Sequence, residues 1–183
     1  FVAVTNTLYN GPTGTNGWYA VNKGRLRYPR IGTPSAAITH SACCGDFRTL
    51  TTPSLVNSLK LEVTLAASGT FYVYGELYAP DRSDIPAGLP TGAKTVGIWR
   101  MRITSNESPD GSPRSFVSVL PTFRYDHTQV KASESLALYR HNGSAWVQVG
   151  SGTPDGTSLI SASAPLPPVN GEVGWFAVVT KPR

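Results

Sequence analysis

The stretch Leu136–Val149, LALYRHNGSAWVQV, is the clearest guide to the fold of this chain. Two segments in which apolar and polar residues alternate meet at Asn142-Gly143. Asn and Gly tolerate the positive φ that both central residues of a type I′ hairpin turn require. A two-residue loop there predicts that Tyr139 faces Trp146 across the ribbon, with aliphatic residues on the opposite side. The segment therefore predicts an antiparallel β-hairpin.

A second stretch, Leu55–Leu65, has the most regular alternation in the chain. Its Leu and Val residues fall mostly on one parity and its polar residues on the other, which is the period of a half-buried strand. A turn at Ala66–Gly69 leads into Thr70–Ala79, which alternates in the same way. We expect these two segments to be strands that pair with each other in antiparallel fashion.

Most of the remaining chain also divides into short strands separated by turn residues. Ser115–Tyr125 is expected to bend or break at Pro121, whereas Val173–Thr180 is apolar on both parities, as in a central strand covered on both faces. Further candidate strands are Phe1–Leu8, Trp18–Val21, Arg25–Ile31, Val96–Thr104 and Thr157–Ala162. The pattern predicts an all-β fold, an antiparallel β-sandwich or jelly roll of about nine to eleven strands.

The chain of 183 residues suits one large domain. A break in the loop Pro80–Gly92 would leave two halves that are each marginal for a core of their own. No fixed-period repeat and no low-complexity linker interrupts the sequence. We therefore expect a single β-sandwich domain over residues 1–183.

Charged residues make up only 15% of the chain, below the roughly 25% of typical soluble domains. This composition is typical of secreted or virion-surface β proteins. The formal net charge is +5, and the densest basic segment holds Arg25, Arg27 and Arg30. These arginines either form a solvated strand face or contact an anionic partner such as an acidic glycan. Nucleic acid is disfavoured, since the sequence has no recognition helix and no known binding motif.

Sequence motifs for catalysis, metal binding and phosphate binding are absent, including HExxH, GxSxG, GxGxxG and the P-loop pattern. The histidines lie at or near turn signals and are not spaced as metal ligands. Paired carboxylates could hydrolyse a glycoside, and the candidates are Glu62, Glu76 and Glu172. We nevertheless expect no catalytic residue, no cofactor and no metal site, and hence a protein that is not an enzyme.

Aromatic residues are the strongest candidates for contact with a partner or a glycan. Tyr72, Tyr74 and Tyr78 share one parity of their predicted strand with Glu76. A carboxylate among aromatic rings can bind a sugar, although a solvated strand face explains the same pattern.

Tyr139 and Trp146 form a second aromatic candidate group. Three interpretations stay open. The pair packs in the core, forms a flat platform for a sugar ring, or makes an intersubunit contact, where Tyr and Trp are favoured.

Two further features leave alternatives open. Cys43 and Cys44 are adjacent in sequence, and they are either unpaired thiols or include one that bonds to another chain. The segment Asp81–Asp84 is either a turn capped by its aspartates or a loop that offers oxygen ligands to Ca²⁺.

Three segments carry a resemblance to known proteins: FRYD at Phe123–Asp126, LALYR at Leu136–Arg140 and NGSAWV at Asn142–Val147. Through them, residues 123–179 resemble C-terminal β modules of large secreted bacterial surface proteins that occur beside autotransporter-like repeats. The NGSAWV segment is also similar to segments of phage structural proteins of the tail and head. The resemblance implies an extracellular or virion-surface setting and implies no catalytic residue.

These features predict a non-enzymatic structural or surface protein. It would associate with copies of itself or dock on a larger assembly, as a filament, a capsid decoration or a tail component. The alternative is a carbohydrate-binding module on a secreted protein. Edge strands offer unpaired backbone groups for strand addition, and Phe1–Leu8 is the candidate donor.

We expect an extracellular, cell-surface or virion-surface location. No run of about 18 apolar residues occurs, so no membrane span is expected. The sequence begins at Phe1 rather than Met and carries no signal segment, which predicts a processed product or an excised piece.

Overall fold

The computed structural model describes residues 25–32, 38–41, 59–67, 69–78, 83–106, 111–155 and 158–183. Side chains are described from residue 61 onward within these ranges, except at 69–77. Three predictions lie outside the described residues: the strand Trp18–Val21, the donor strand Phe1–Leu8 and the state of Cys43 and Cys44.

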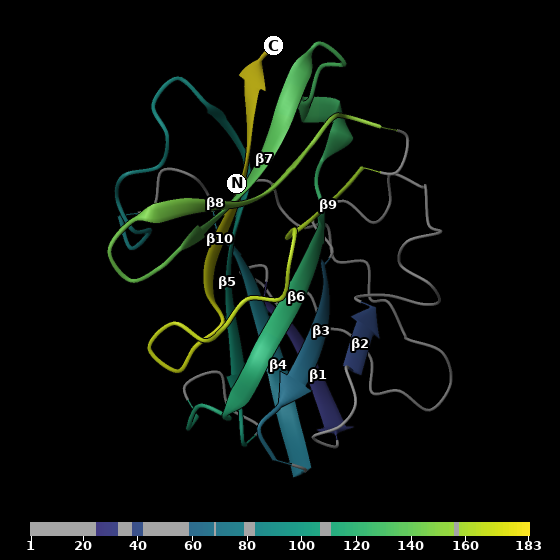
Figure 1. The fold of residues 1–183 in the computed structure, drawn as a ribbon, viewed down its shortest axis with the longest axis vertical. Helices are drawn as coiled ribbons and strands as arrows, with labels where there is room; N and C mark the ends of the chain where they lie inside the picture. The colour runs from purple at the N-terminus through teal and green to yellow at the C-terminus, as the bar shows by residue number, and fades with distance from the viewer. Residues whose placement is uncertain are drawn as a thin grey trace.

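Two antiparallel sheets form the molecule (Figure 1). The larger sheet has the strand order β1-β4-β5-β10-β7-β8, and the smaller has the order β2-β3-β6-β9. The larger sheet consists of β1 (Arg25–Gly32), β4 (Gly69–Tyr78), β5 (Lys94–Thr104), β10 (Gly174–Pro182), β7 (Glu134–His141) and β8 (Trp146–Gly152). The smaller consists of β2 (Ile38–Ser41), β3 (Leu59–Leu65), β6 (Phe116–Arg124) and β9 (Leu159–Ser161).

Helix is almost absent from the described residues. A three-residue 3-10 helix, η2 (His127–Gln129), follows β6, and Asp126 caps its first turn. Within the described ranges, no helix has the length and apolar character needed to cross a bilayer.

The hydrophobic core lies between the two sheets. Alternation along β5 directs Trp99 and Met101 into the same buried cluster as Leu61 and Val63 of β3. The rings of Trp99 and Phe123, which come from opposite sheets, lie 4.6 Å apart. Burial of each such side chain contributes about 1.5–3 kcal/mol. The predicted all-β, antiparallel fold class is therefore confirmed.

Side chains are described along seven strands, β3 and β5 to β10. They form a three-stranded and a four-stranded part of the two sheets. The seven strands with described side chains are fewer than the nine to eleven strands expected from the sequence. The strands β1, β2 and β4 are described by their backbone and their pairing.

The predicted pairing of Leu55–Leu65 with Thr70–Ala79 is wrong. The strand β3 pairs with β2 and β6, whereas β4 pairs with β1 and β5, in the other sheet. The turn after Leu65 crosses between the sheets, and the Arg114 guanidinium donates to the Ala67 carbonyl at 2.8 Å. Alternation buries the same side chains whether two strands pair side by side or face each other across the core. The sequence pattern therefore could not distinguish the two arrangements.

The sequence predicts a bend or an interruption at Pro121, and the interruption is absent, because β6 runs without a break between β3 and β9. The Pro121 carbonyl accepts a hydrogen bond from the Ala162 N–H at 3.1 Å. The N and the C=O of one strand residue point to the same side, so the missing N–H also faces β9. The ladder between β6 and β9 ends at the Thr122–Ser161 pair, and Pro121 lies just beyond it.

The prediction of a central strand at Val173–Thr180 is confirmed, since β10 lies between β5 and β7. Phe176 and Val178 face the core between the sheets, whereas Ala177 and Val179 belong to a second buried cluster on the opposite face. Residues of the loop between β4 and β5 pack on that second cluster, among them Ile85, Leu89 and Ala93.

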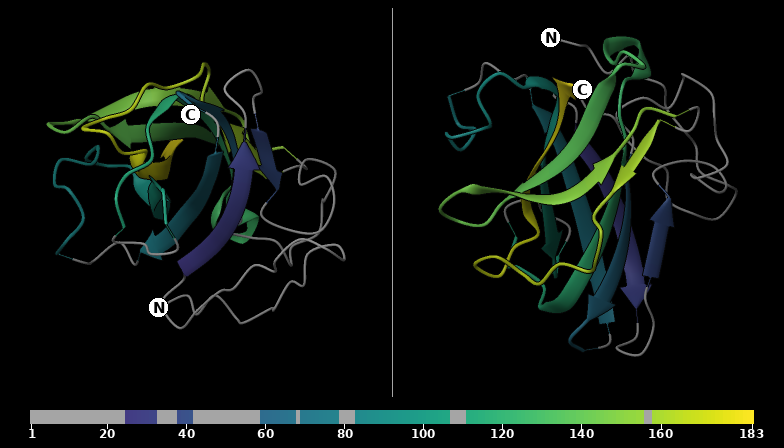
Figure 2. Two further views of the ribbon diagram at one scale, coloured as in Figure 1. Left: turned by 90° about the horizontal axis from the view of Figure 1, so that it is seen from below. Right: turned by 45° about the horizontal axis from the view of Figure 1, so that its top comes forward.

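One side of the molecule is closed where β8 approaches β9 (Figure 2, right). The Ser163 N–H donates to the Val149 carbonyl at 2.8 Å. A Cβ at Gly150 would overlap the carbonyl oxygen of Ser161, so this approach requires glycine.

Candidate contact surface on the six-stranded sheet

The outer face of the six-stranded sheet, which points away from the core, carries the candidate site. Trp99 and Met101 of β5 are buried in the core, and the alternate residues Arg100 and Arg102 lie on the other face and are half-buried. A row of arginines on a central strand is therefore part of this outer face.

The strand register places aromatic and acidic positions beside these arginines. Arg100 lies opposite Glu76 of β4 on one side and Trp175 of β10 on the other, and Arg102 lies opposite Tyr74. Directly opposed positions on paired strands share a face of the sheet.

The same register extends to β1, where Arg25 lies opposite Glu76 and Arg27 lies opposite Tyr74. We call the positions of this set the aromatic–arginine face: Arg25, Arg27, Tyr72, Tyr74, Glu76, Tyr78, Arg100, Arg102 and Trp175.

Four described side chains form one connected group at this face. The rings of Tyr78 and Trp175 meet edge to face, with centroids 4.6 Å apart. The Arg100 guanidinium lies 5.4 Å from the centre of the Trp175 ring and 3.8 Å from a carboxylate oxygen of Glu172. The side chains of Arg100 and Glu172 are 29% and 36% exposed, so their ion pair contributes about 0–1 kcal/mol. The ion pair therefore orients the group and adds little to folding.

Arg140, which is buried, holds the loop that carries Glu172. Its Nε and Nη2 donate to the Val173 carbonyl at 3.0 and 2.7 Å, and its Nη1 donates to the Pro167 carbonyl at 2.6 Å. Burial lowers the pKa of Arg140 to about 10, so the guanidinium is still charged at neutral pH. Arg140 is thus a structural cation, and its charge is directed to the backbone of this loop.

Five of the residues predicted as contact residues come together in the structure. Arg25, Arg27, Tyr72, Tyr74 and Tyr78 all occupy positions of the aromatic–arginine face. The sequence had suggested two separate groups, one basic and one aromatic. Pairing of β1 with β4 makes them neighbours.

Arg30 does not join this group. Its position is opposite Phe71, on the other parity of both strands, and hence on the other face of the sheet. The three arginines of the predicted anion contact are therefore divided between two faces.

The predicted pairing of Tyr139 with Trp146 is wrong. Tyr139 lies opposite Gln148, and Trp146 lies opposite His141, with ring centroids 5.5 Å apart. The hairpin loop has four residues, Asn142–Ala145, and β8 contains one extra residue, Val149, between its pairs with Leu138 and Tyr139.

Of the three interpretations of this aromatic pair, burial favours the core for Trp146. Trp146 is only 8% exposed, and its indole N–H donates to the Pro86 carbonyl at 2.9 Å. The loop between β4 and β5 therefore covers this ring. Tyr139 is half-buried at the edge of the same cluster and borders a shallow groove.

Sequence reasoning missed Trp175, the ring at the centre of the described group. A signal was available, because Trp175 closely follows Asn170-Gly171, a turn signal of the same kind as Asn142-Gly143. Sequence reasoning also missed a set of exposed cations at one end of the molecule, which come from separate segments: Lys94, Lys131, Lys181 and Arg183. No single stretch of sequence holds more than two of them.

The carboxylates considered for glycoside hydrolysis have different surroundings. Glu62 lies on β3 of the smaller sheet, whereas the positions of Glu76 and Glu172 both adjoin Arg100. In the part of the chain that the structure describes, no group of three or more His, Cys, Asp or Glu side chains could hold a metal ion. Asp84 of the candidate Ca²⁺ loop is exposed, and Asp81 lies outside the described residues.

Comparison with known proteins adds no relative: no family model, no curated protein and no solved structure matches this chain.

Proposed function

We propose that the protein is a non-enzymatic structural or surface module that acts by contact. It associates with copies of itself or docks on a larger extracellular, cell-surface or virion-surface assembly. The aromatic–arginine face is the contact surface.

The observation that carries this proposal is the convergence of Tyr, Trp and Arg on one sheet face. These residue types are enriched in protein interfaces and supply most of the binding energy where they are found there. The edge-to-face pair of Tyr78 and Trp175, with Arg100 beside it, supports a preformed anchor for a partner. A ring already held in place loses less conformational entropy when a partner binds.

Sedimentation velocity of the full chain over about 1–100 μM, a range chosen for moderate affinities, tests self-association. We expect oligomers or larger particles, which negative-stain electron microscopy would display. Trp175→Ser should weaken association by about tenfold or more, the loss of an anchor residue.

Val117→Ser is the matched control. Val117 is 57% exposed on β6 of the smaller sheet, so its replacement removes apolar surface away from the proposed contact. The control should associate as the unmodified protein does. An equal loss in both variants would contradict the assignment to the aromatic–arginine face.

A second candidate function is a carbohydrate-binding module, and the same variants test it when glycan binding is measured beside association. A chain that stays monomeric, yet binds a glycan in a manner that Trp175→Ser abolishes, would replace self-association by sugar binding. The same aromatic rings would then serve as a stacking platform.

A further inference from the structure

A shallow groove of about 510 Å³ lies on the outer face of β7, β8 and β10. It is distinct from the aromatic–arginine face, none of whose residues line it. Its lining is Ser135, Leu136, Ala137, Tyr139, Gln148, Ser151, Gly152, Thr153, Val179 and Lys181. A volume of this size is within the range of pockets that hold small ligands.

The depth of the groove follows from the strand register. Ala137 is at its centre, with Val179 opposite on β10 and Ser151 opposite on β8. These side chains are short. Along the strands, Tyr139 of β7 lies two residues from Ala137 in one direction, and Lys181 of β10 lies two residues from Val179 in the other. These longer side chains form the walls of the groove, and the short ones form its floor.

Polar groups on the walls are neutral except at one end. The Tyr139 hydroxyl donates to Gln148 Oε1 at 3.4 Å, and Ser151 and Thr153 are exposed. An aromatic wall, an apolar floor and several hydroxyl and amide groups match a sugar ring, which has an apolar C–H face and a rim of hydroxyls.

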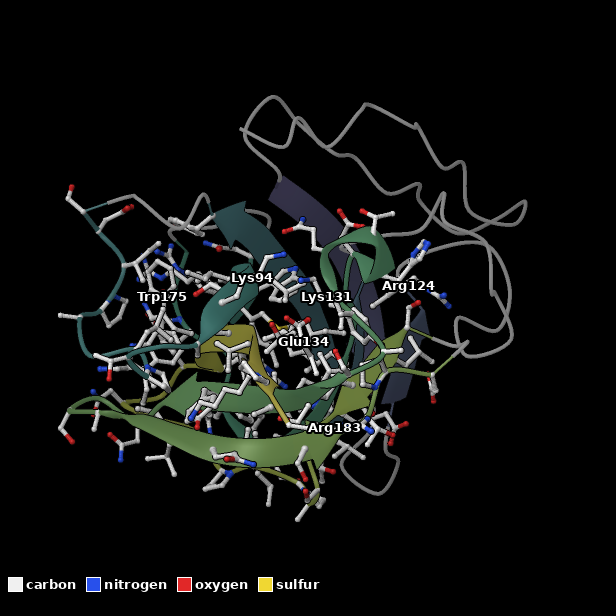
Figure 3. All side chains as sticks on the ribbon, turned by 90° about the horizontal axis from the view of Figure 1, so that it is seen from above. Lys94, Arg124, Lys131, Glu134, Trp175 and Arg183 are labelled. Atoms are coloured by element: carbon white, nitrogen blue, oxygen red, sulfur yellow. The ribbon has the colours of Figure 1, made fainter. Side chains whose placement is uncertain are left out.

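Lys181 makes one end of the groove cationic. It is exposed and lies opposite Ser135, whose hydroxyl donates to the Lys181 carbonyl at 3.3 Å. Three further exposed cations, Lys94, Lys131 and Arg183, lie at the same end of the molecule (Figure 3). This end therefore attracts an anionic group.

The nearby carboxylates do not cancel this charge from within the groove. Glu134 accepts the Lys131 backbone N–H at 2.8 Å, and Asp126 accepts hydrogen bonds from Thr128 and Gln129. Both carboxylates are held by their own loop and neither lines the groove.

We propose that this groove binds one acidic sugar residue of a glycan. The ring lies over Ala137 against the face of Tyr139, and the carboxylate of the sugar points toward Lys181. The site is independent of the contact surface proposed above, and either can fail without the other.

Isothermal titration calorimetry with tetragalacturonate and with its methyl ester tests the proposal. The two probes share their rings and hydroxyls and differ in charge. We expect the acid to bind and the ester to bind at least about tenfold more weakly, the loss of one charge-assisted contact. Lys181→Gln should remove this preference, whereas Lys94→Gln, at the same end but outside the groove, should keep it.

Two variants close the groove in different ways. Ala137→Phe fills its centre, and Ser151→Trp places a large side chain over it from an exposed position. Both should abolish binding of tetragalacturonate. If Ala137→Phe does not fold, Ser151→Trp still tests the proposal, because it leaves the core unchanged. The proposal is overturned if the unmodified protein does not bind the acid, if acid and ester bind equally, or if the folded Ser151→Trp variant binds as before.

Discussion

Two Asn-Gly dipeptides lie side by side in this molecule and form different turns. Asn142-Gly143 connects β7 to β8, and Asn170-Gly171 lies in the loop before β10 (Figure 2, right). A Cβ at Gly143 would lie 3.4 Å from the side-chain nitrogen of Asn170, so the two turns are in contact.

In the first turn, Asn142 acts through its side chain. Its Oδ1 accepts hydrogen bonds from the backbone N–H groups of Ser144 and Ala145 and from the Ser144 hydroxyl, at 2.9–3.0 Å. Gly143 has φ +100°, and Asn142 is not among the described residues with positive φ. The central residues of the turn are thus Gly143 and Ser144, one position later than a type I′ turn at Asn-Gly requires.

In the second turn, Asn170 acts through its backbone. Asn170 and Gly171 have φ of +51° and +78°, and Val169 and Glu172 exchange two backbone hydrogen bonds of 2.9 Å. Positive φ at both central residues is the type I′ pattern. A turn of the expected type therefore exists in the molecule at Asn170-Gly171.

The difference shows that an Asn-Gly dipeptide offers two kinds of turn. A serine after the glycine allows the Asn142 side chain to collect the turn's N–H groups. The second turn has no such residue, and Arg140 holds the backbone beside it through the carbonyls of Pro167 and Val173.

The largest expected effect comes from replacing Arg140, the buried cation that holds the backbone beside the second turn and not the first. Arg140→Met keeps much of the packing on Phe176 but leaves buried carbonyls without a donor. We expect the free energy of unfolding to fall by about 3 kcal/mol, measured by urea denaturation with tryptophan fluorescence. Arg100→Met, which removes a partly exposed partner of Glu172, should cost no more than about 1 kcal/mol. Equal losses would contradict the role assigned to Arg140.

An intermediate effect is expected from adding a Cβ at each glycine. Gly143→Ala should cost about 2 kcal/mol, since its φ of +100° lies beyond the left-handed values that other residues adopt. Gly171→Ala should cost about 1 kcal/mol, because only its φ is unfavourable and no atom lies within 4 Å of the added carbon. Thermal unfolding followed by circular dichroism would rank the two variants, and the reverse order would refute this account.

The smallest expected effects separate the two asparagines most sharply. Asn142→Gly removes the side-chain acceptor and should cost about 1 kcal/mol, whereas Asn170→Gly keeps the allowed backbone and should change stability by less than about 0.5 kcal/mol. Asn142→Asp retains the acceptor and serves as the control. If both glycine variants lose the same stability in urea denaturation, the two asparagines do not differ as described.

Sequence reasoning predicted most strands and their buried faces. The alternation of β3 and β5, and the double parity of β10, reported burial correctly because neighbouring strand residues must point to opposite sides. Sequence reasoning assigned some strands to the wrong neighbours, as in the predicted pairing of β3 with β4. Alternation shows which face of a strand is buried, but it does not show which strand lies beside it.

The candidate site was predictable only in fragments. Tyr72, Tyr74 and Tyr78 share a face by spacing alone, and so do Arg25 and Arg27. Their convergence depends on the register between β1 and β4, and the position of Trp175 depends on the pairing of β10 with β5. The basic end of the groove comes from four cations in three separate segments, so no local sequence pattern predicts it.

The amino-acid sequence by itself determined the antiparallel β class, the buried parity of strands such as β3, β5 and β10, and the presence of tight turns. These properties depend on side-chain alternation and backbone φ, which act over a few residues. The tertiary structure decided which of the two described Asn-Gly dipeptides forms a type I′ turn, which sheet each described strand joins and which residues share the outer face. Those outcomes depend on contacts between distant segments, such as Arg140 with the loop before β10 and Trp146 with Pro86.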